Sequence, residues 1–450
     1  MARTGASARA WGGASQYAGL AVAGAAAALL LASGPALAAA GGGLAPEPLV
    51  LFGIPVDFIL FAATLLSVAL FHHYTLHVAL TGLAAITIYK LAFTGFKFGT
   101  GIAGLVGHMQ HEWVILANLF CLLMGFALLS RHFERSNVPE AMPAYLPDDW
   151  KGGFALLAIV FVMSAFLDNI AAALIGGTIA KHVYKSRVHI GFVAAIVAAS
   201  NAGGSGSVVG DTTTTMIWIA GISPLKVLGA YVAAATALLV FGIPAALQQH
   251  RYQPILKDPT PGLVIDWARV GVVVAILVTA VAANVTANLY FPVLLDNLPV
   301  IGLAVVAAIL VTGLIRRPDW EILPENFKGT IFLLALVTCA SMMPVEKLPA
   351  ASWPTTLGLG FVSSVFDNIP LTELAIKQGG YDWGMLAYAV GFGGSMIWFG
   401  SSAGVAISNI FPEARSIGRW VANGWHVALG YVIGFFVLLA LLGWHPDAPH

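Results

Sequence analysis

Long apolar stretches recur along almost the whole chain, separated by short polar segments. A helix needs about 20 apolar residues to cross the ~30 Å hydrocarbon core of a bilayer. By this pattern, membrane-spanning helices are predicted over Leu49–Phe71, Thr75–Gly95, Trp113–Ser130, Ile190–Gly221, Leu225–Leu247, Val270–Phe291, Pro299–Ile315, Thr330–Met343, Gly384–Phe411 and Trp425–Trp444. The predicted fold class is an all-α polytopic membrane protein with ten transmembrane helices.

Two further apolar stretches, Phe154–Ala180 and Trp353–Lys377, are interrupted near their middles by an Asp-Asn pair. The first contains "FLDNIAAAL", which starts at Phe166, and the second contains "FDNIPLTEL", which starts at Phe366. Each stretch fits either one crossing helix or a re-entrant hairpin that enters and leaves on the same side. We expect Pro370 to help end the first half-helix of the second hairpin, because proline lacks the donor that a continuing helix needs.

The charges of the loops distinguish these two topologies, because cytoplasmic loops carry an excess of Lys and Arg. With an external N-terminus and two hairpins, 14 basic residues lie inside: Arg131, Arg135, Lys151, Lys181, Lys185, Arg187, Arg251, Lys257, Arg269, Arg316, Arg317, Lys328, Arg415 and Arg419. Five lie outside or near an outer helix end: Lys90, Lys97, Lys226, Lys347 and Lys377. If the stretch Phe154–Ala180 crossed the membrane instead, the basic residues that follow it, Lys181, Lys185 and Arg187, would lie outside. The loop charges therefore favour re-entrant hairpins, one opening to each side.

Equivalent hairpins on opposite sides of the membrane predict an inverted repeat. The duplication is also visible in the residues, because Gly203-Gly204-Ser205 and Gly210-Asp211 align without a gap on Gly393-Gly394-Ser395 and Gly400-Ser401. The predicted organisation is N-terminal helices over 49–152, a first repeat core over 153–247, connecting helices over 248–329, a second repeat core over 330–437 and a C-terminal end over 438–450.

Residues 1–38 have the features of a signal peptide. Arg3 and Arg9 precede an apolar stretch around Leu20 to Leu31, and Ala36-Leu37-Ala38 gives a small-x-small cleavage pattern. An uncleaved additional helix is the alternative interpretation.

Composition supports the membrane assignment and excludes several classes of protein. Hydrophobic residues make up 59% of the 450 residues and charged residues only 9%, which a soluble domain with a polar surface does not show. The formal net charge is zero and there is no basic tract, so nucleic acid is not an expected partner. The two cysteines, Cys121 and Cys339, exclude a disulfide framework.

The segment "SNAGGSGSVVGDTTTTMIW", Ser200 to Trp218, is poorly suited to a continuous helix. It contains four glycines, each of which costs about 1 kcal/mol relative to alanine, and a run of four threonines. A broken helix is predicted here and at the equivalent place in Gly384–Phe411. At such a break, freed carbonyls and side-chain oxygens can coordinate a cation.

Three carboxylates fall within these predicted intramembrane segments: Asp168, Asp211 and Asp367. Each costs roughly 3 kcal/mol in lipid, so they should face one another or a wet cavity. Oxygen ligands suit a hard cation such as sodium, and the candidates are Asp168, Asn169, Asn201, Asp211, Thr213, Thr214, Asp367, Asn368, Ser401 and Ser402. The three aspartates are the predicted sodium ligands. A carboxylate that binds either a proton or a cation makes exchange possible. The alternative is that the Asp-Asn pairs only cap helix starts.

With these motifs the chain resembles the NhaD-type sodium/proton antiporters, within the ion transporter superfamily that also holds citrate, dicarboxylate and arsenite carriers. The resemblance covers about Val50 to Trp444 and rests on "DNIAAALIGG" at Asp168, "SNAGG" at Ser200, "GDTTTTMIW" at Gly210 and "SSVFDNIPLT" at Ser363. It implies exchange of sodium or lithium for protons across the inner membrane, in a multi-pass homodimer without a cofactor. The family motif adds Ser363 to the polar positions above.

Two rival functions remain open at this point. One is a sodium-coupled or proton-coupled carrier of a citrate, dicarboxylate or arsenite-type substrate. Aspartates at both hairpin tips would repel such an anion, which favours the antiporter. The other is an intramembrane enzyme, for which we find no His-Glu zinc motif or nucleophile-base pair. The protein is therefore not expected to be an enzyme.

Overall fold

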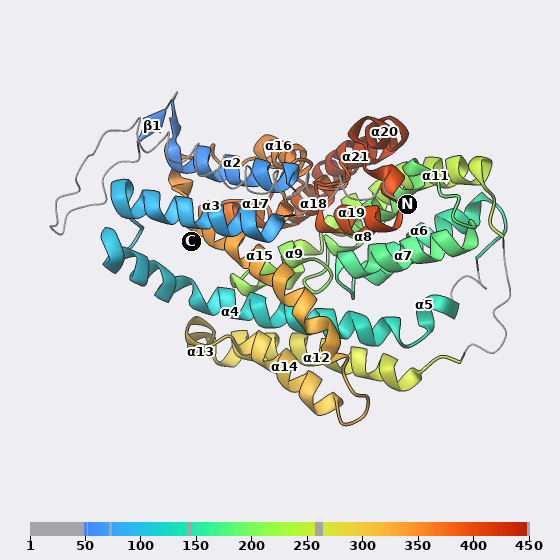
Figure 1. Cartoon of the computed structure of the whole chain (residues 1–450), viewed down its shortest axis with the longest axis horizontal. Coiled ribbons are helices and arrows are strands. Elements are labelled where there is room, and N and C mark those ends of the chain that lie inside the picture. Colours follow the sequence, from blue (N-terminus) through green and yellow to red (C-terminus); the bar gives the residue numbers. More distant parts are fainter. Residues whose placement is uncertain (1–48, 52, 72–73, 142–145, 257–263, 448–450) are drawn as a thin grey trace, which may run out of the picture. The chain divides into compact units, whose positions relative to one another are not determined.

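The computed structural model describes residues 49–51, 53–71, 74–141, 146–256 and 264–447 (Figure 1). The expected signal peptide, residues 1–38, lies outside the described residues. The chain divides into two compact units. The first contains the described residues up to Trp113 together with Lys328–Lys347, and the second contains Val114–Phe327 and the residues from Leu348 onward.

The first unit is a short hairpin followed by helices. Its elements are β1 Val50–Leu51, β2 Ile54–Pro55, α2 Val56–Leu70, α3 Thr75–Tyr89, the π-helix η1 Lys90–Thr94, the first part of α4 Gly101–Glu134, the last part of α15 Leu323–Ser341, and η4 Val345–Lys347. The helix predicted from Leu49 thus begins at Val56. Gly53, with a φ of +80°, forms the turn between the two strands.

The second unit holds the remaining elements. They are α5 Val138–Ala141, α6 Trp150–Ser164, α7 Asn169–Val183, α8 Ile190–Gly204, α9 Thr212–Ile219, α10 Pro224–Val227, α11 Ala230–Tyr252, α12 Trp267–Tyr290, α13 Pro292–Asn297, α14 Val300–Thr312, η3 Trp320–Ile322, α16 Trp353–Ser363, α17 Asn368–Gln378, α18 Trp383–Gly393, α19 Ser402–Ile410, η5 Pro412–Ala414, α20 Ile417–Asn423 and α21 Trp425–Leu442, together with the other parts of α4 and α15.

Within the described residues, six helices are long and apolar enough to cross a membrane: Thr75–Thr94, Gly101–Glu134, Pro224–Tyr252, Trp267–Ala287, Trp320–Ser341 and Trp425–Leu442. Shorter apolar helices accompany them. The chain is therefore a polytopic membrane protein built almost entirely of helices. The helix predicted over Trp113–Ser130 is longer than expected, because α4 runs from Gly101 to Glu134. Its N-terminal extension contains His108, whose Nε2 lies 3.0 Å from Ser341 Oγ.

Each polar interruption that the sequence predicted separates two helices. In the two Asp-Asn stretches, α6 ends at Ser164 before α7 starts at Asn169, and α16 ends at Ser363 before α17 starts at Asn368. The two Gly-rich stretches are interrupted in the same way, between α8 and α9 and between α18 and α19. Apolar helices thus give way to irregular backbone at four places in the second unit.

The expected role of Pro370 is wrong. The helix before the interruption ends at Ser363, and Pro370 lies in the first turn of the following helix, α17. The first backbone N–H groups of a helix have no partner within the helix, so proline is tolerated there without loss of a hydrogen bond. Pro370 therefore belongs to the start of a helix and not to the end of one.

The core of the second unit surrounds α8, in which every residue from Gly191 to Gly204 is buried. A helix that is buried on all sides needs small and apolar residues around its whole circumference, and the sequence of α8 has them. Helices α6, α7 and α11 pack against it and lie side by side in green in Figure 1. Helix α21 packs along α11.

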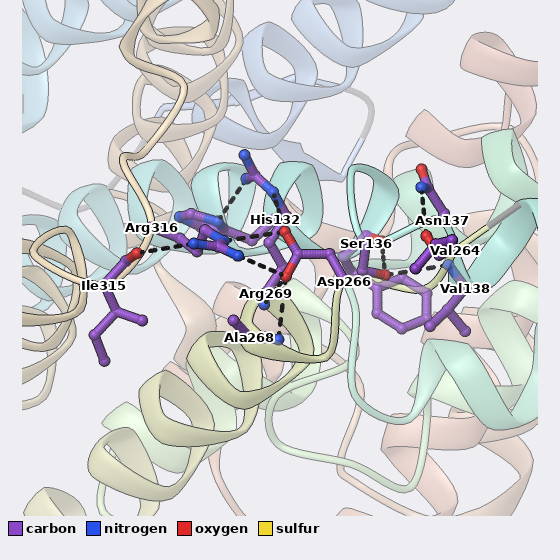
Figure 2. Close-up of polar contacts among 11 residues, drawn as sticks. His132, Ser136, Asn137, Val138, Val264, Asp266, Ala268, Arg269, Ile315 and Arg316 are labelled. Atoms are coloured by element: carbon purple, nitrogen blue, oxygen red, sulfur yellow. Dashed lines mark hydrogen bonds and ion pairs between the residues drawn. The ribbon is translucent and has the colours of Figure 1, made fainter.

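A charged cluster joins the end of α4 to the start of α12 (Figure 2). Asp266 caps α12 by accepting from the backbone N–H of Ala268 at 3.1 Å. Its carboxylate also accepts from Arg316 Nε at 3.0 Å, and Arg269 Nη1 lies 3.2 Å from His132 Nδ1. In the loop before η3, Asp319 pairs with Arg131 at 2.9 Å and with Arg135 at 2.7 Å.

Candidate functional site

The four interruptions place oxygen-bearing side chains at helix N-termini. Asp168, Asp211 and Asp367 each occupy the N-cap position of the following helix, where Oδ1 accepts a hydrogen bond from the backbone N–H two residues on, at 3.2, 3.2 and 3.0 Å. Ser401 caps α19 by accepting from Gly404 N–H at 3.3 Å. Asp and Ser are preferred here because they satisfy an otherwise unpaired backbone donor. The capping role considered from the sequence is therefore present.

Asn201 connects the interruptions to one another. Its Oδ1 accepts from Asn169 Nδ2 at 3.2 Å, which links the end of α8 to the start of α7. Its Nδ2 donates to Ser395 Oγ at 2.9 Å and to Ser401 Oγ at 3.1 Å, on either side of the α18–α19 interruption. Because Asn201 is fully buried, this hydrogen-bonded network holds three interruptions together inside the protein.

Asp211 has one carboxylate oxygen that capping does not use. Oδ2 is buried and, within the described residues, has no hydrogen-bond partner, and the same is true of Thr213 Oγ1. Helix α18 approaches closely at Gly391, where a Cβ atom would lie 2.9 Å from Asp211 Oδ2. An unpaired buried polar atom is costly, so such an atom indicates a bound group or a functional role.

Asp168 and Asp211 line one small cavity. Its wall also contains Val209, Thr212 and Thr215, together with the α4 residues Leu119, Leu122, Leu123 and Phe126. Apolar walls lower the local dielectric and strengthen any interaction between a cation and these carboxylates. Two of the three predicted aspartates therefore lie on the wall of the same cavity.

The other predicted site residues have different surroundings. Asp367 Oδ2 accepts from Ser402 Oγ at 3.4 Å, while Ser363 Oγ donates to Val390 O at 2.8 Å. Thr214 Oγ1 donates to backbone oxygens of its own segment, Ser207 O at 2.5 Å and Asp211 O at 2.8 Å. Asn368 is buried at the start of α17. Asp168 thus shares a cavity with Asp211, and Asp367 accepts a hydrogen bond from Ser402.

Among the described residues, the charge of the site is not compensated by Lys or Arg. Within the described part of the chain, no Lys or Arg forms an ion pair with any of the three aspartates. In the same residues, no three His, Cys, Asp or Glu side chains converge as a ligand group. A cation bound here would therefore be held by one or two carboxylates together with amide, hydroxyl and carbonyl oxygens, which are ligands that suit sodium better than a transition metal.

Sequence reasoning did not include Ser395 among the site residues. It accepts a hydrogen bond from Asn201 and is fully buried. The sequence could have identified Ser395 as a candidate, because it is the aligned counterpart of Ser205 in the two Gly-Gly-Ser motifs. Ser205 itself donates to Ala202 O at 2.8 Å.

These features define a multi-pass membrane protein with a buried acidic site, and sequence comparisons add its relatives. Sodium/proton antiporter 1 of Arabidopsis thaliana is 27% identical over 375 residues, which cover 72% of this chain and 60% of the plant protein. The Na+/H+ antiporter NhaD of Vibrio parahaemolyticus is 23% identical over 366 residues, covering 66% of this chain and 84% of the bacterial protein. No family profile matches the chain.

The chain is thus a distant homologue of Na+/H+ antiporters, among them NhaD and plant antiporters. These relatives are named as transporters and not as enzymes. The resemblance found in the motifs is therefore confirmed.

Proposed function

We propose that this protein is a secondary active antiporter that exchanges sodium or lithium for protons across the inner membrane. The observation that carries the proposal is Asp211, whose buried Oδ2 has no hydrogen-bond partner among the described residues and which lines a cavity together with Asp168. Distant homology to Na+/H+ antiporters supports the same activity.

Exchange follows because sodium ions and protons compete for the same carboxylates. When a sodium ion binds, Asp211 must be ionised, so its proton leaves. When the ion leaves, a proton from the opposite side neutralises the buried carboxylate, because an ionised carboxylate without a partner is unfavourable in a site of low dielectric. Thr213 supplies a neutral oxygen next to this carboxylate, Asn169 and Asn201 supply others in the network that joins the interruptions, and Asp367 with Ser402 forms the corresponding part of the second half.

An inverted repeat, with cores at 153–247 and 330–437 and two re-entrant hairpins, is part of this proposal. Two kinds of contact support it. Helix α7 packs on α19 and α17 packs on α9, so each half contributes to the other. A Cβ at Gly203 would lie 2.0 Å from Phe161 O, and one at Gly393 would lie 2.2 Å from Gly360 O. Equivalent motifs thus make equivalent close approaches.

A homodimer in the inner membrane completes the proposal, and its support is the family resemblance alone. The rival is a sodium-coupled or proton-coupled carrier of citrate, a dicarboxylate or arsenite. An anionic substrate needs a positive or hydrogen-bond-donating site, whereas Asp168 and Asp211 would repel it. The site geometry therefore favours the antiporter.

The test is proton movement in vesicles that contain the purified protein. Sodium or lithium is added to vesicles with an imposed proton gradient. The addition should change the pH inside the vesicles, which a pH-sensitive dye follows. Asp211→Asn should reduce this signal to that of protein-free vesicles while the protein still elutes as a folded species. The matched control is Asp382→Asn at the N-cap of α18, where Asp382 accepts from Met385 N–H at 3.0 Å, and it should retain exchange.

Two outcomes would contradict the proposal. Uptake of citrate or arsenite without proton movement in response to sodium or lithium would favour the rival carrier. Full exchange by Asp211→Asn would remove Asp211 from the ion site.

A further inference from the structure

Helix α18 contributes a glycine, Gly391, to the surroundings of Asp211. The helix packs against both α8 and α9, which lie on either side of the first Gly-rich interruption. A Cβ atom at Gly391 would lie 2.9 Å from Asp211 Oδ2 and 3.7 Å from Thr213 Oγ1. Both oxygens are buried and have no hydrogen-bond partner within the described residues. Two unpaired oxygens therefore lie beside the same residue of α18.

Close helix packing alone does not account for these two oxygens. Glycine is common where helices approach each other in membranes, so Gly391 by itself would need no further explanation. A packed contact, however, normally leaves buried polar atoms with partners, because an unpaired buried oxygen is costly. Asp211 Oδ2 and Thr213 Oγ1 are both in this unfavourable situation. A ligand that interacts with both oxygens would relieve it.

The aligned residue in the first Gly-rich segment is an asparagine. The register that superimposes the two Gly-Gly-Ser motifs places Asn201 opposite Gly391. Asn201 Nδ2 donates to Ser395 Oγ at 2.9 Å and to Ser401 Oγ at 3.1 Å. The amide hydrogens therefore bring partial positive charge to two oxygens of the second Gly-rich interruption.

The residues beside Gly391 are the aligned counterparts of those that the asparagine contacts. Ser205 aligns with Ser395, and Asp211 aligns with Ser401. The Cβ of Ser205 would lie 3.6 Å from a Cβ at Gly391, next to the contact with Asp211. The two aligned segments thus make corresponding contacts, but only the asparagine has a side chain that reaches the oxygens. Glycine has no amide group with which to supply positive charge.

We propose that the transported cation binds between Asp211 Oδ2 and Thr213 Oγ1, against the backbone of Gly391, where it supplies the charge that the asparagine amide supplies in the other segment. This inference rests on the proposed function and adds where the ion binds and which residue limits its size. A carboxylate and a neutral hydroxyl oxygen suit a monovalent hard cation. The carboxylate balances its single charge, as a buried site requires.

Gly391 then sets the largest ion that the site accepts. A methyl group at this position would lie 2.9 Å from Asp211 Oδ2, which is closer than an ordinary contact. The methyl group therefore takes part of the room between the carboxylate and α18. Because a sodium ion is larger than a lithium ion, Gly391→Ala should weaken the binding of sodium more than the binding of lithium.

The experiment measures cation binding by the full-length protein in detergent, without transport. The thermal unfolding midpoint is recorded as lithium or sodium chloride replaces choline chloride at constant ionic strength. A cation that binds the folded state raises the midpoint, and the concentration dependence gives its apparent affinity. Both ions should raise the midpoint of the wild type. In Gly391→Ala the apparent affinity for sodium should fall about tenfold relative to that for lithium. Gly358→Ala, where nothing lies within 4 Å of the added Cβ, is the matched control and should keep both affinities.

Thr213→Val tests the same site without a change at Gly391. Valine keeps the shape of threonine but lacks the hydroxyl group. Because Thr213 Oγ1 has no hydrogen-bond partner among the described residues, its loss should not lower the midpoint in choline chloride. The apparent affinity for both ions should fall about tenfold, since an interaction between a charged and a neutral group contributes roughly that factor. Thr312→Val in α14, whose Oγ1 donates to Ala308 O at 2.7 Å, is the control and should bind both ions like the wild type.

Three results would overturn the inference. The first is a wild-type midpoint that neither sodium nor lithium changes. The second is a folded Gly391→Ala variant that binds both ions like the wild type or loses affinity for both equally. The third is a Thr213→Val variant with wild-type affinity for both ions, and this result decides the question if Gly391→Ala does not fold.

The inference and the proposed function can fail separately. Suppose that vesicles exchange sodium for protons and that Asp211→Asn loses this exchange. If Gly391→Ala and Thr213→Val then bind both ions like the wild type, the antiporter stands and the inferred position of the ion is wrong. If these two variants change ion binding as expected but vesicles show no exchange, the binding site stands without the proposed function.

Discussion

At the scale of single residues, Asn201 does what no charged residue could do at its position. One end of its amide accepts from Asn169 and the other donates to Ser395 and Ser401. A neutral side chain with donors and an acceptor can link several helix starts without adding charge to a buried site. The network also fixes the positions of groups next to the aspartates.

We expect Asn201→Ala to destabilise the protein by about 1–3 kcal/mol, because partners of the amide are left buried and unpaired. It should also weaken the apparent affinity for sodium. The measurements are the thermal unfolding midpoint in detergent and the sodium concentration that gives half-maximal exchange. Asn423→Ala, where Asn423 Nδ2 donates only to Arg419 O in an exposed part of α20, should change neither quantity. An unchanged sodium affinity in Asn201→Ala would contradict a role in the site.

At the scale of elements, two tight contacts between interruptions depend on glycine. A Cβ at Gly210 would lie 1.9 Å from Ser164 O, and a Cβ at Gly400 would lie 2.4 Å from Ser364 O. Both distances are shorter than any tolerated contact with backbone. Each Gly-rich interruption therefore lies against the C-terminal end of the helix that precedes an Asp-Asn interruption, α6 for Gly210 and α16 for Gly400.

Gly210→Ala and Gly400→Ala should each reduce the yield of folded protein, because backbone would have to move to accept the methyl group. The size-exclusion profile and the thermal midpoint measure this effect. Gly358→Ala in α16 is the control, since nothing lies within 4 Å of the added Cβ. It should be neutral or stabilising by up to about 1 kcal/mol. If Gly210→Ala and Gly400→Ala both had the size-exclusion profile and thermal midpoint of the wild type, the close contacts would be contradicted.

The charged cluster at the helix ends gives a pH dependence. The hydrogen bond from Arg316 and the neighbouring backbone donors hold the pKa of Asp266 below its ordinary value. Arg131 lowers the pKa of Asp319 in the same way, with Arg135 adding to the effect. Because the folded pKa lies below the unfolded value of about 3.9, this stabilisation is present above that pH and is lost as the pH falls through the folded pKa.

Acidification should therefore loosen the start of α12. Amide exchange of Ala268 and Arg269, whose N–H groups donate to Asp266, should be slow near pH 6 and less protected, after correction for intrinsic exchange, at a pH below about 3.9. In Asp266→Asn the difference in amide protection between the two pH values should shrink. The same protection at both pH values in the wild type would show that the cluster does not hold this helix start.

At the scale of the whole molecule, helices from distant parts of the chain pack against one another in the second unit. Helix α7 packs on α19, and α17 packs on α9. In the first of these contacts a Cβ at Gly177 would lie 3.1 Å from Ile407 Cδ1, and Ile407 is fully buried. Because these contacts join segments that lie far apart in the chain, we expect the helices involved to fold cooperatively.

A double-mutant cycle tests this packing. Ile407→Ala should cost about 2–5 kcal/mol by leaving a cavity. Gly177→Ala alone should be mildly destabilising, because its methyl group crowds Ile407. In the double variant the methyl group partly fills the cavity, so the combined loss in thermal midpoint should be smaller than the sum of the single losses. Leu441→Ala, at an exposed position of α21, should combine additively with Gly177→Ala. Additive behaviour of Gly177→Ala with Ile407→Ala would contradict the α7–α19 contact.

The positions of the interruptions could be predicted because they depend on local chemistry. Asp168, Asp211, Asp367 and Ser401 begin helices in the structure because Asp and Ser satisfy free backbone donors wherever they occur. Pro370 was misplaced for a related reason, since proline is compatible with a helix start as well as with a helix end. The length of α4 was also missed, because hydropathy does not reveal that a buried histidine has a partner on another helix.

The sequence by itself determined that the chain enters a membrane, where its helices break and which oxygens accompany the breaks. Hydrophobic length and helix capping are properties of neighbouring residues, so a single sequence contains them. Only the tertiary structure decided that Asn201 joins three interruptions, that Asp168 shares a cavity with Asp211 while Asp367 pairs with Ser402, and that Lys90 pairs with Asp57. These are contacts between distant segments, and they depend on how helices pack rather than on any local pattern.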